Sequence, residues 1–145
     1  MVAMNARRRG TPLTIVTAGF AADERHGICY ATVGGGGRET LVRVEFACRP
    51  LPVLRGRDVA YYALDALAGE LLRRGTGRVE IHVDDEYLPE DLKQRRALPS
   101  PLTVPYVALR CRLNRFDQAT VRRADGVARD LTARAQAEVF LNVAA

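Results

Sequence analysis

Residues 79–88 read VEIHVDDEYL, and this stretch decides how the rest of the chain is interpreted. Its first five residues alternate apolar and polar side chains, which is typical of a half-buried β-strand. Two aspartates, Asp84 and Asp85, follow at once. Carboxylates at the end of a strand either contribute to a metal site or form the polar start of a loop that caps the next helix. The surrounding sequence has to decide between these two interpretations.

Three further strands are predicted upstream of this stretch. The segments 13–22 and 27–33 read as strands, and the segment 39–49 alternates with a period of two. The glycine run 34–37 predicts a hairpin connection, because glycine reaches positive φ without steric cost. Short connections between consecutive strands favour an antiparallel meander.

A helix is predicted between the meander and the 78–84 strand. Apolar residues recur three or four positions apart within 56–77, and Asp58 near the start of this segment suits the helix dipole. The segment 89–98 predicts a second, short helix. The prolines that follow it predict an irregular loop.

Two elements are predicted after this loop. The segment 106–116 alternates and is predicted to be the fifth strand, with Arg110 and Arg112 on one face. Helical spacing from Gln118 to about Phe140 predicts a long C-terminal helix. The order β-β-β-α-β-α-β-α predicts one α/β domain with a mixed five-stranded sheet, because crossover helices follow the meander. We expect a disordered basic arm over 1–12 that includes Arg7, Arg8 and Arg9, the domain over 13–141, and a tail over 142–145.

Composition constrains the class of protein. The chain has 145 residues and a net charge of +5, and Lys93 is its only lysine. The excess of arginine has two open explanations, a GC-rich genome and binding to phosphate. Three cysteines, odd in number and far apart, predict reduced thiols in a cytoplasmic protein and no zinc cluster. Neither a secretory signal nor a membrane-spanning segment is predicted, so no membrane partner is expected.

Four short motifs occur in a telling order. They are the opening hairpin IVTAGFAADERHGICYATV (15–33), the helix AYYALDAL (60–67), the strand VEIHVDDEYL (79–88) and the terminal helix DGVARDLTARA (125–135). Together they resemble the ribonuclease H fold of the bacterial and plant type HI kind, and the resemblance implies that fold over residues 13–138. Enzymes of this family use carboxylates to hold two divalent ions, which activate water and cleave an RNA strand paired with DNA.

The resemblance also places the four metal-ligand positions of the family. They fall on Ala18, Ala60, Asp84 and Arg129, and an asparagine of the family falls on Asp125. Only Asp84 keeps a carboxylate, and a positive charge at Arg129 disfavours a cation. Asp84 is therefore interpreted as the remnant of a metal site, a weak ligand at most. No cofactor is expected, and Mg²⁺ or Mn²⁺ would be needed only if the chain is an active nuclease.

Other carboxylates lie near the replaced positions. Asp58 precedes Ala60 by two residues, and Asp130 follows Arg129. Neighbouring residues on a helix point about 100° apart, so using either one would break the apolar match of its helix.

Three functions remain open. The first is a degenerate, non-catalytic ribonuclease H-like domain that binds nucleic acid, with an RNA-containing duplex favoured because aromatic residues are sparse. The second is an active metal-dependent ribonuclease. The third is a protein-interaction or dimerisation scaffold, a possible homo-oligomer with the tail 139–145 as a docking segment. In the first case five arginines would contact phosphates: Arg110, Arg112, Arg122, Arg123 and Arg129.

Overall fold

The computed structural model describes residues 11–35, 37–93, 97–124 and 126–144. The predicted basic arm with Arg7, Arg8 and Arg9 lies outside the described residues, as does Asp125. The side chains of the predicted tail, 142–145, also lie outside them.

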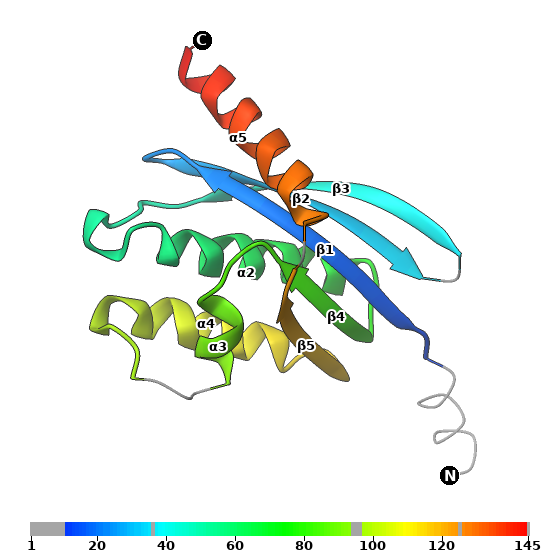
Figure 1. The fold of residues 1–145 in the computed structure, drawn as a ribbon. Helices are drawn as coiled ribbons and strands as arrows, with labels where there is room; N and C mark the ends of the chain where they lie inside the picture. Colours follow the sequence, from blue (N-terminus) through cyan, green and yellow to red (C-terminus); the bar gives the residue numbers. More distant parts are fainter. Residues whose placement is uncertain (1–10, 36, 94–96, 125, 145) are drawn as a thin grey trace.

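The first three strands and the helix after them are confirmed. The three strands form the predicted meander, and α2 follows it after a single 3-10 turn (Figure 1). The 78–84 strand is also confirmed, as is a short helix after it. The elements are β1 (Leu13–Ala22), β2 (His26–Gly35), β3 (Arg38–Ala47), η1 (Pro52–Leu54), α2 (Arg57–Arg73), β4 (Arg78–Val83), α3 (Leu88–Leu92), η2 (Ser100–Leu102), α4 (Thr103–Leu113), β5 (Gln118–Arg123) and α5 (Ala128–Ala144).

The predicted mixed five-stranded sheet is also confirmed. Its strand order is β3-β2-β1-β4-β5. The meander strands pair antiparallel, whereas β4 pairs parallel with both β1 and β5. The sheet edges are therefore β3 and β5, and β1 and β4 lie side by side in the interior of the sheet.

The prediction of a strand over 106–116, carrying Arg110 and Arg112, is wrong. This segment lies in helix α4, and the first residues of the predicted C-terminal helix form β5 instead. The buried residues of α4 are Pro105, Leu109 and Leu113, which are spaced four apart as on one face of a helix. The irregular loop predicted from the prolines is wrong at Pro105 too, because proline is tolerated in the first turn, where the N–H has no intrahelical partner.

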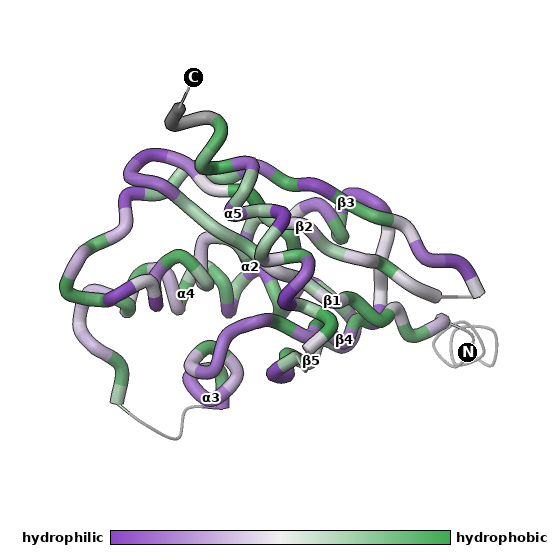
Figure 2. Tube along the Cα trace, turned by 45° about the horizontal axis from the view of Figure 1, so that its top comes forward, coloured by the Kyte–Doolittle hydropathy of each residue, from purple (hydrophilic) through white to green (hydrophobic). Residues whose placement is uncertain are grey.

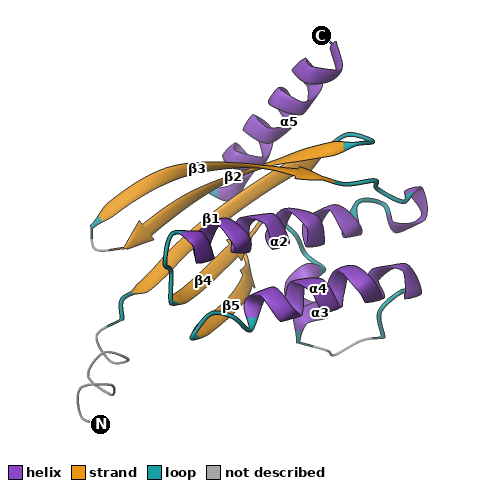
Figure 3. Ribbon diagram, turned by 180° about the vertical axis from the view of Figure 1, so that it is seen from behind, coloured by secondary structure: helices purple, strands orange, loops and turns teal. Residues whose placement is uncertain are grey.

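The sheet is covered by helices on both faces. Helices α2 and α4 pack on one face, and α5 crosses β1 and β2 on the other (Figures 1 and 3). The main core lies between the sheet and α2, whereas a smaller cluster under α5 contains Ile28, Leu131 and Val139. Figure 2 shows alternating hydrophilic and hydrophobic positions along β3, as expected for a strand with one buried face. Within the described residues, no helix is both long and apolar enough to cross a membrane.

Candidate functional site

Asp84 lies at the carboxyl end of β4, beside β1. Ala18 and Val83 are partners in the parallel register of these strands, and the Asp84 N–H donates a 3.1 Å hydrogen bond to the Ala18 carbonyl. Two of the four family positions, 18 and 84, are therefore adjacent, as the resemblance implies. The Ala18 side chain is buried and offers no ligand atom.

The carboxylate of Asp84 is tied to α5. Its Oδ2 accepts a 2.7 Å hydrogen bond from the Thr132 hydroxyl. Helix α5 can approach this closely because residue 19 is glycine. A Cβ at Gly19 would lie 2.3 Å from the Thr132 nitrogen and 2.8 Å from the Ala128 carbonyl oxygen. The glycine thus sets the position of the first turns of α5 against β1, and α5 in turn holds Asp84.

The other two family positions supply no carboxylate. Ala60 lies in the first turn of α2 and is fully buried at 0% exposure. Arg129 is exposed in the first turn of α5, one helical turn before Thr132. Among the described residues, no group of three or more His, Cys, Asp or Glu side chains could hold a metal ion. These residues therefore do not fit the two-ion site of the family enzymes.

The nearby carboxylates do not replace the missing ligands. Asp58 is buried, and it accepts hydrogen bonds of 2.8 Å from the Leu51 N–H and 3.1 Å from the Val59 N–H. Asp130 is exposed on α5. The Asp58 carboxylate therefore holds the segment before α2 against the first turn of that helix.

Asp85 forms the start of the next loop. It accepts hydrogen bonds from the backbone N–H groups of Tyr87 (3.1 Å) and Leu88 (2.7 Å), which shape the turn that leads into α3. Burial raises the pKa of the Asp85 carboxyl above its ordinary value, although these two hydrogen bonds act in the opposite direction. Asp85 is therefore the polar start of a loop, whereas the N-cap of α3 is Tyr87, which makes no side-chain cap.

A polar cavity of about 380 Å³ opens beside Asp84. It is lined by the residues just before α2, by the loop 84–87 and by the last residue of β5. Gly56, at the start of α2, provides no side-chain cap, and the Val59 N–H already donates to Asp58, so only the N–H groups before Val59 could meet an anion. Two lining arginines, Arg55 and Arg123, are exposed and have no ion-pair partner within the described part of the chain.

A buried ion pair supports one wall of this cavity. Nη2 of Arg57 lies 3.1 Å from both carboxylate oxygens of Asp91, and the guanidinium stacks 4.5 Å from the centre of the Tyr87 ring. The Tyr61 hydroxyl donates a 2.9 Å hydrogen bond to the same carboxylate. Burial, followed by the hydrogen bond to Asp91, raises the pKa of Tyr61 well above its usual range. Arg57 is thus a fixed part of the wall.

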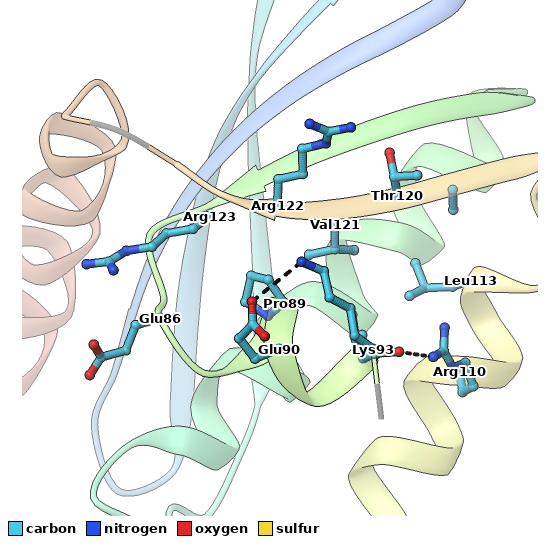
Figure 4. Close-up of a pocket in the computed structure, with 12 residues that line it drawn as sticks. Glu86, Pro89, Glu90, Lys93, Arg110, Leu113, Thr120, Val121, Arg122 and Arg123 are labelled. Carbon is cyan, nitrogen blue, oxygen red and sulfur yellow. Dashed lines mark hydrogen bonds and ion pairs between the residues drawn. The ribbon is translucent and has the colours of Figure 1, made fainter. Parts of the chain in front are cut away.

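A second cavity, of about 700 Å³, runs between β5 and the helices α3 and α4 (Figure 4). Lys93 forms an ion pair with Glu90 at 3.4 Å, and Arg110 donates a hydrogen bond to the Leu92 carbonyl. Arg123 lines both this cavity and the one beside Asp84. It therefore lies at the boundary between the two cavities.

Three of the five arginines predicted to contact phosphates, Arg110, Arg122 and Arg123, line the second cavity (Figure 4). Arg122 also pairs with Glu80 at 3.4 Å. Arg123 reaches the Asp84 end of the sheet as well, where Arg129 lies in the first turn of α5. Arg112 bonds Asp65 of α2 at 3.2 Å.

Three residues of this region were missed by sequence reasoning. Thr132 gave no signal, because its contact with Asp84 joins positions 48 residues apart. Arg55 and Arg57 flank Gly56 at the start of the predicted helix segment 56–77, and a glycine between two arginines at a helix start was the available signal.

Comparisons with known proteins agree with this architecture. No protein-family model and no curated protein sequence matches the chain. Among solved structures, the RNase H1 of the halophilic archaeon Halobacterium salinarum NRC-1 is similar with a TM-score of 0.72 and 15% identity, over 90% of this chain and 98% of that one. The N-terminal RNase H domain of rv2228c from Mycobacterium tuberculosis is similar with a TM-score of 0.67 and 15% identity, over 85% and 95%.

A third solved structure is LC11-RNase H1 in complex with an RNA/DNA hybrid. It has a TM-score of 0.60 and 10% identity, over 88% of this chain and 99% of that one. The strand order, the parallel β1–β4 pair that carries Asp84 and these likenesses together show that the chain has a ribonuclease H-like fold.

Proposed function

We propose that this chain binds the phosphate backbone of an RNA–DNA duplex at the Asp84 end of the sheet and does not cleave it. The observation that carries the proposal is a set of exposed arginines, Arg55, Arg123 and Arg129, that form no ion pair with any described residue and lie around a position where the family enzymes hold metal.

The cations come from three different elements and meet at one end of the sheet. Arg55 lies between η1 and α2, Arg123 ends β5 and Arg129 is the second residue of α5. Arginine fits phosphate because its planar guanidinium donates two parallel hydrogen bonds. The uncapped start of α2 adds N–H donors beside Arg55. This end of the molecule therefore offers both kinds of donor that bind phosphate oxygens.

The same end of the sheet lacks what cleavage requires. A two-ion mechanism needs carboxylates from several elements to bridge and position the ions. Here Ala18 and Ala60 supply no oxygen, and the carboxylate of Asp84 already accepts the Thr132 hydroxyl. Binding without hydrolysis is the activity that these side chains support.

Two further points favour an RNA-containing duplex as the ligand. A similar solved structure, LC11-RNase H1, was determined in complex with an RNA/DNA hybrid. Aromatic residues make up 6% of the chain and there is no tryptophan, so stacking on unpaired bases has few participants. Recognition by shape and phosphate contacts suits a duplex better.

Fluorescence anisotropy with labelled RNA–DNA hybrid, double-stranded DNA, double-stranded RNA and single-stranded RNA tests the binding. We expect the hybrid to bind with an affinity that falls steeply with salt, and Arg55→Ala, Arg123→Ala and Arg129→Ala each to reduce the salt slope by about one. Arg115→Ala is the matched control, because Arg115 is exposed beyond the opposite end of β5. Absence of binding at low salt would overturn the proposal.

Cleavage is tested separately by incubating the hybrid with Mg²⁺ or Mn²⁺. We expect no product above the level of the Asp84→Asn variant. Metal-dependent cleavage that this variant loses would instead establish the active ribonuclease.

A further inference from the structure

The outer edge of β3 carries an inference that is independent of the proposed function. Among the described residues β3 pairs only with β2, and the ladder between them is continuous over all ten residues of β3. The strand contains no proline, and Figures 1 and 3 show no helix or loop beside its outer edge in the part of the chain that the structure describes. Proteins protect a long, regular edge with prolines, bulges, a covering segment or charged side chains. β3 has only the last of these, charges of both signs at Arg38, Glu39, Arg43 and Glu45. Such an edge admits another strand where opposite charges meet.

The hydrogen bonds to β2 show which backbone groups face outward. The Cys48 N–H donates to the Arg25 carbonyl at 3.1 Å, next to the register pair His26 and Ala47. Because bonded and non-bonded pairs alternate in an antiparallel ladder, the even-numbered residues of β3 bond to β2. The N–H and C=O groups that face outward belong to the odd-numbered residues Glu39, Leu41, Arg43, Glu45 and Ala47.

The side chains of these odd-numbered residues share the face of the sheet on which α5 lies. The even-numbered Val42 and Phe46 are buried on the opposite face, against α2. Leu41, by contrast, is 45% exposed near the middle of the edge.

We propose that two copies of this chain associate through β3, antiparallel, about a two-fold axis at Leu41. In this register Leu41 lies opposite Leu41 of the partner subunit, and Glu39 lies opposite Arg43 of the partner subunit. The two-fold axis repeats the Glu39–Arg43 pair, so the interface has two opposite-charge pairs around a central leucine pair. The outward backbone groups of both strands then form hydrogen bonds.

The charges select this register among its neighbours. If the axis moves by one residue, Glu39 lies opposite Glu45 or opposite Leu41 of the partner subunit. If the axis moves by two residues, either Glu39 or Arg43 lies opposite its own copy, so like charges meet. Arg43 also keeps a donor for the partner: its Nε bonds Glu138 at 2.7 Å and its Nη2 bonds Glu45 at 2.8 Å, whereas its Nη1 has no partner within the described residues. The interface leaves the Asp84 end of both copies accessible, because β2 and β1 separate β3 from β4.

Sedimentation velocity over a concentration series tests the association with a charge swap. Glu39→Arg alone places arginine opposite Arg43, and Arg43→Glu alone places glutamate opposite Glu39. We expect each variant to raise the dimer dissociation constant by at least about tenfold, because two attractive pairs become repulsive. An equimolar mixture of the two variants restores both pairs with their signs exchanged, so we expect it to dimerise about as well as the wild type. Glu24→Arg, with the same change of charge in the β1–β2 turn, should dimerise like the wild type.

Circular dichroism checks that Arg43→Glu remains folded, because this variant also loses the contact with Glu138. Leu41→Lys provides a second test that does not involve Glu138, and we expect it to prevent dimerisation. A wild-type chain that stays monomeric at about 100 μM would overturn the proposal. So would a dimer that neither charge variant weakens, which would point to another surface, such as the exposed Phe140 and Leu141 near the end of α5.

Discussion

The Thr132 hydroxyl donates a 2.7 Å hydrogen bond to the carboxylate of Asp84, and this contact joins α5 to the end of β4. The carboxylate that the motif resemblance places at a metal-ligand position is therefore already hydrogen-bonded to a neighbouring helix. Replacing Thr132 with valine keeps the shape of the side chain and removes the donor. We expect this variant to lower the free energy of unfolding by about 1–3 kcal/mol, because a hydrogen bond to a charged group is lost. Urea denaturation measures the change, and a variant as stable as the wild type would show that the contact contributes nothing.

Gly19 is expected to tolerate no side chain. A Cβ at this position would meet the backbone of α5 at 2.3 Å, so Gly19→Ala must displace the helix. We expect a loss of about 1–3 kcal/mol in unfolding free energy, as for other overpacked sites. Gly34→Ala is the control, because its new methyl would meet neighbours only at 3.8 Å. Equal stability of the two variants would contradict the close packing of α5 on β1.

The buried pair of Arg57 and Asp91 is expected to matter more than exposed pairs. Asp91 is 4% exposed, and its removal would leave the Arg57 charge partly buried without a partner. We expect Asp91→Ala to lower the unfolding free energy by about 3–5 kcal/mol. Glu70→Ala breaks the ion pairs with Arg73 and Arg74, which lie at the surface of α2. This variant should lower the unfolding free energy by at most about 1 kcal/mol. Similar losses in the two variants would contradict this difference.

Glu138 is expected to make the attachment of α5 sensitive to acid. Hydrogen bonds from Arg43 and then Tyr30 hold the pKa of Glu138 below its ordinary value. A carboxyl group with a lowered pKa in the folded state stabilises the protein above its unfolded pKa and loses that contribution as the pH falls through the folded pKa. We therefore expect Glu138→Gln to be less stable than the wild type at neutral pH and to approach it in acid. Denaturation at several pH values measures this, and a constant difference would count against the assignment.

The elements that could be predicted from the sequence are those whose apolar residues follow one period, either that of a strand or that of a helix. β3 and α2 each show one clear period, and their predicted positions are confirmed. The segment 106–116 satisfies two patterns at once: it alternates, and it also places Leu109 and Leu113 four residues apart. Only packing against α2 selects the helix. β5 has six residues, of which the exposed and partly buried ones alternate, too short a segment to stand out beside the longer helical spacing that follows it.

The positions of individual site residues could be predicted where a single stretch of sequence determines them, whereas contacts between distant elements could not. The strand end placed Asp84, and the motif match placed Ala18 beside it, as the register of β1 and β4 confirms. The partners of these residues come from elsewhere in the chain. Thr132 reaches Asp84 because Gly19 admits α5, and no local pattern encodes a contact of this kind.

The burial of Ala18 and Ala60 has a consequence for engineering a metal site. Both positions are closed within the core, at 1% and 0% exposure. A single mutation that placed a carboxylate at either one would bury an unpaired charge and lower the stability of the fold. A metal-binding centre at this end of the sheet would therefore have to be built by several substitutions at once, so that the ion offsets the cost of each buried charge.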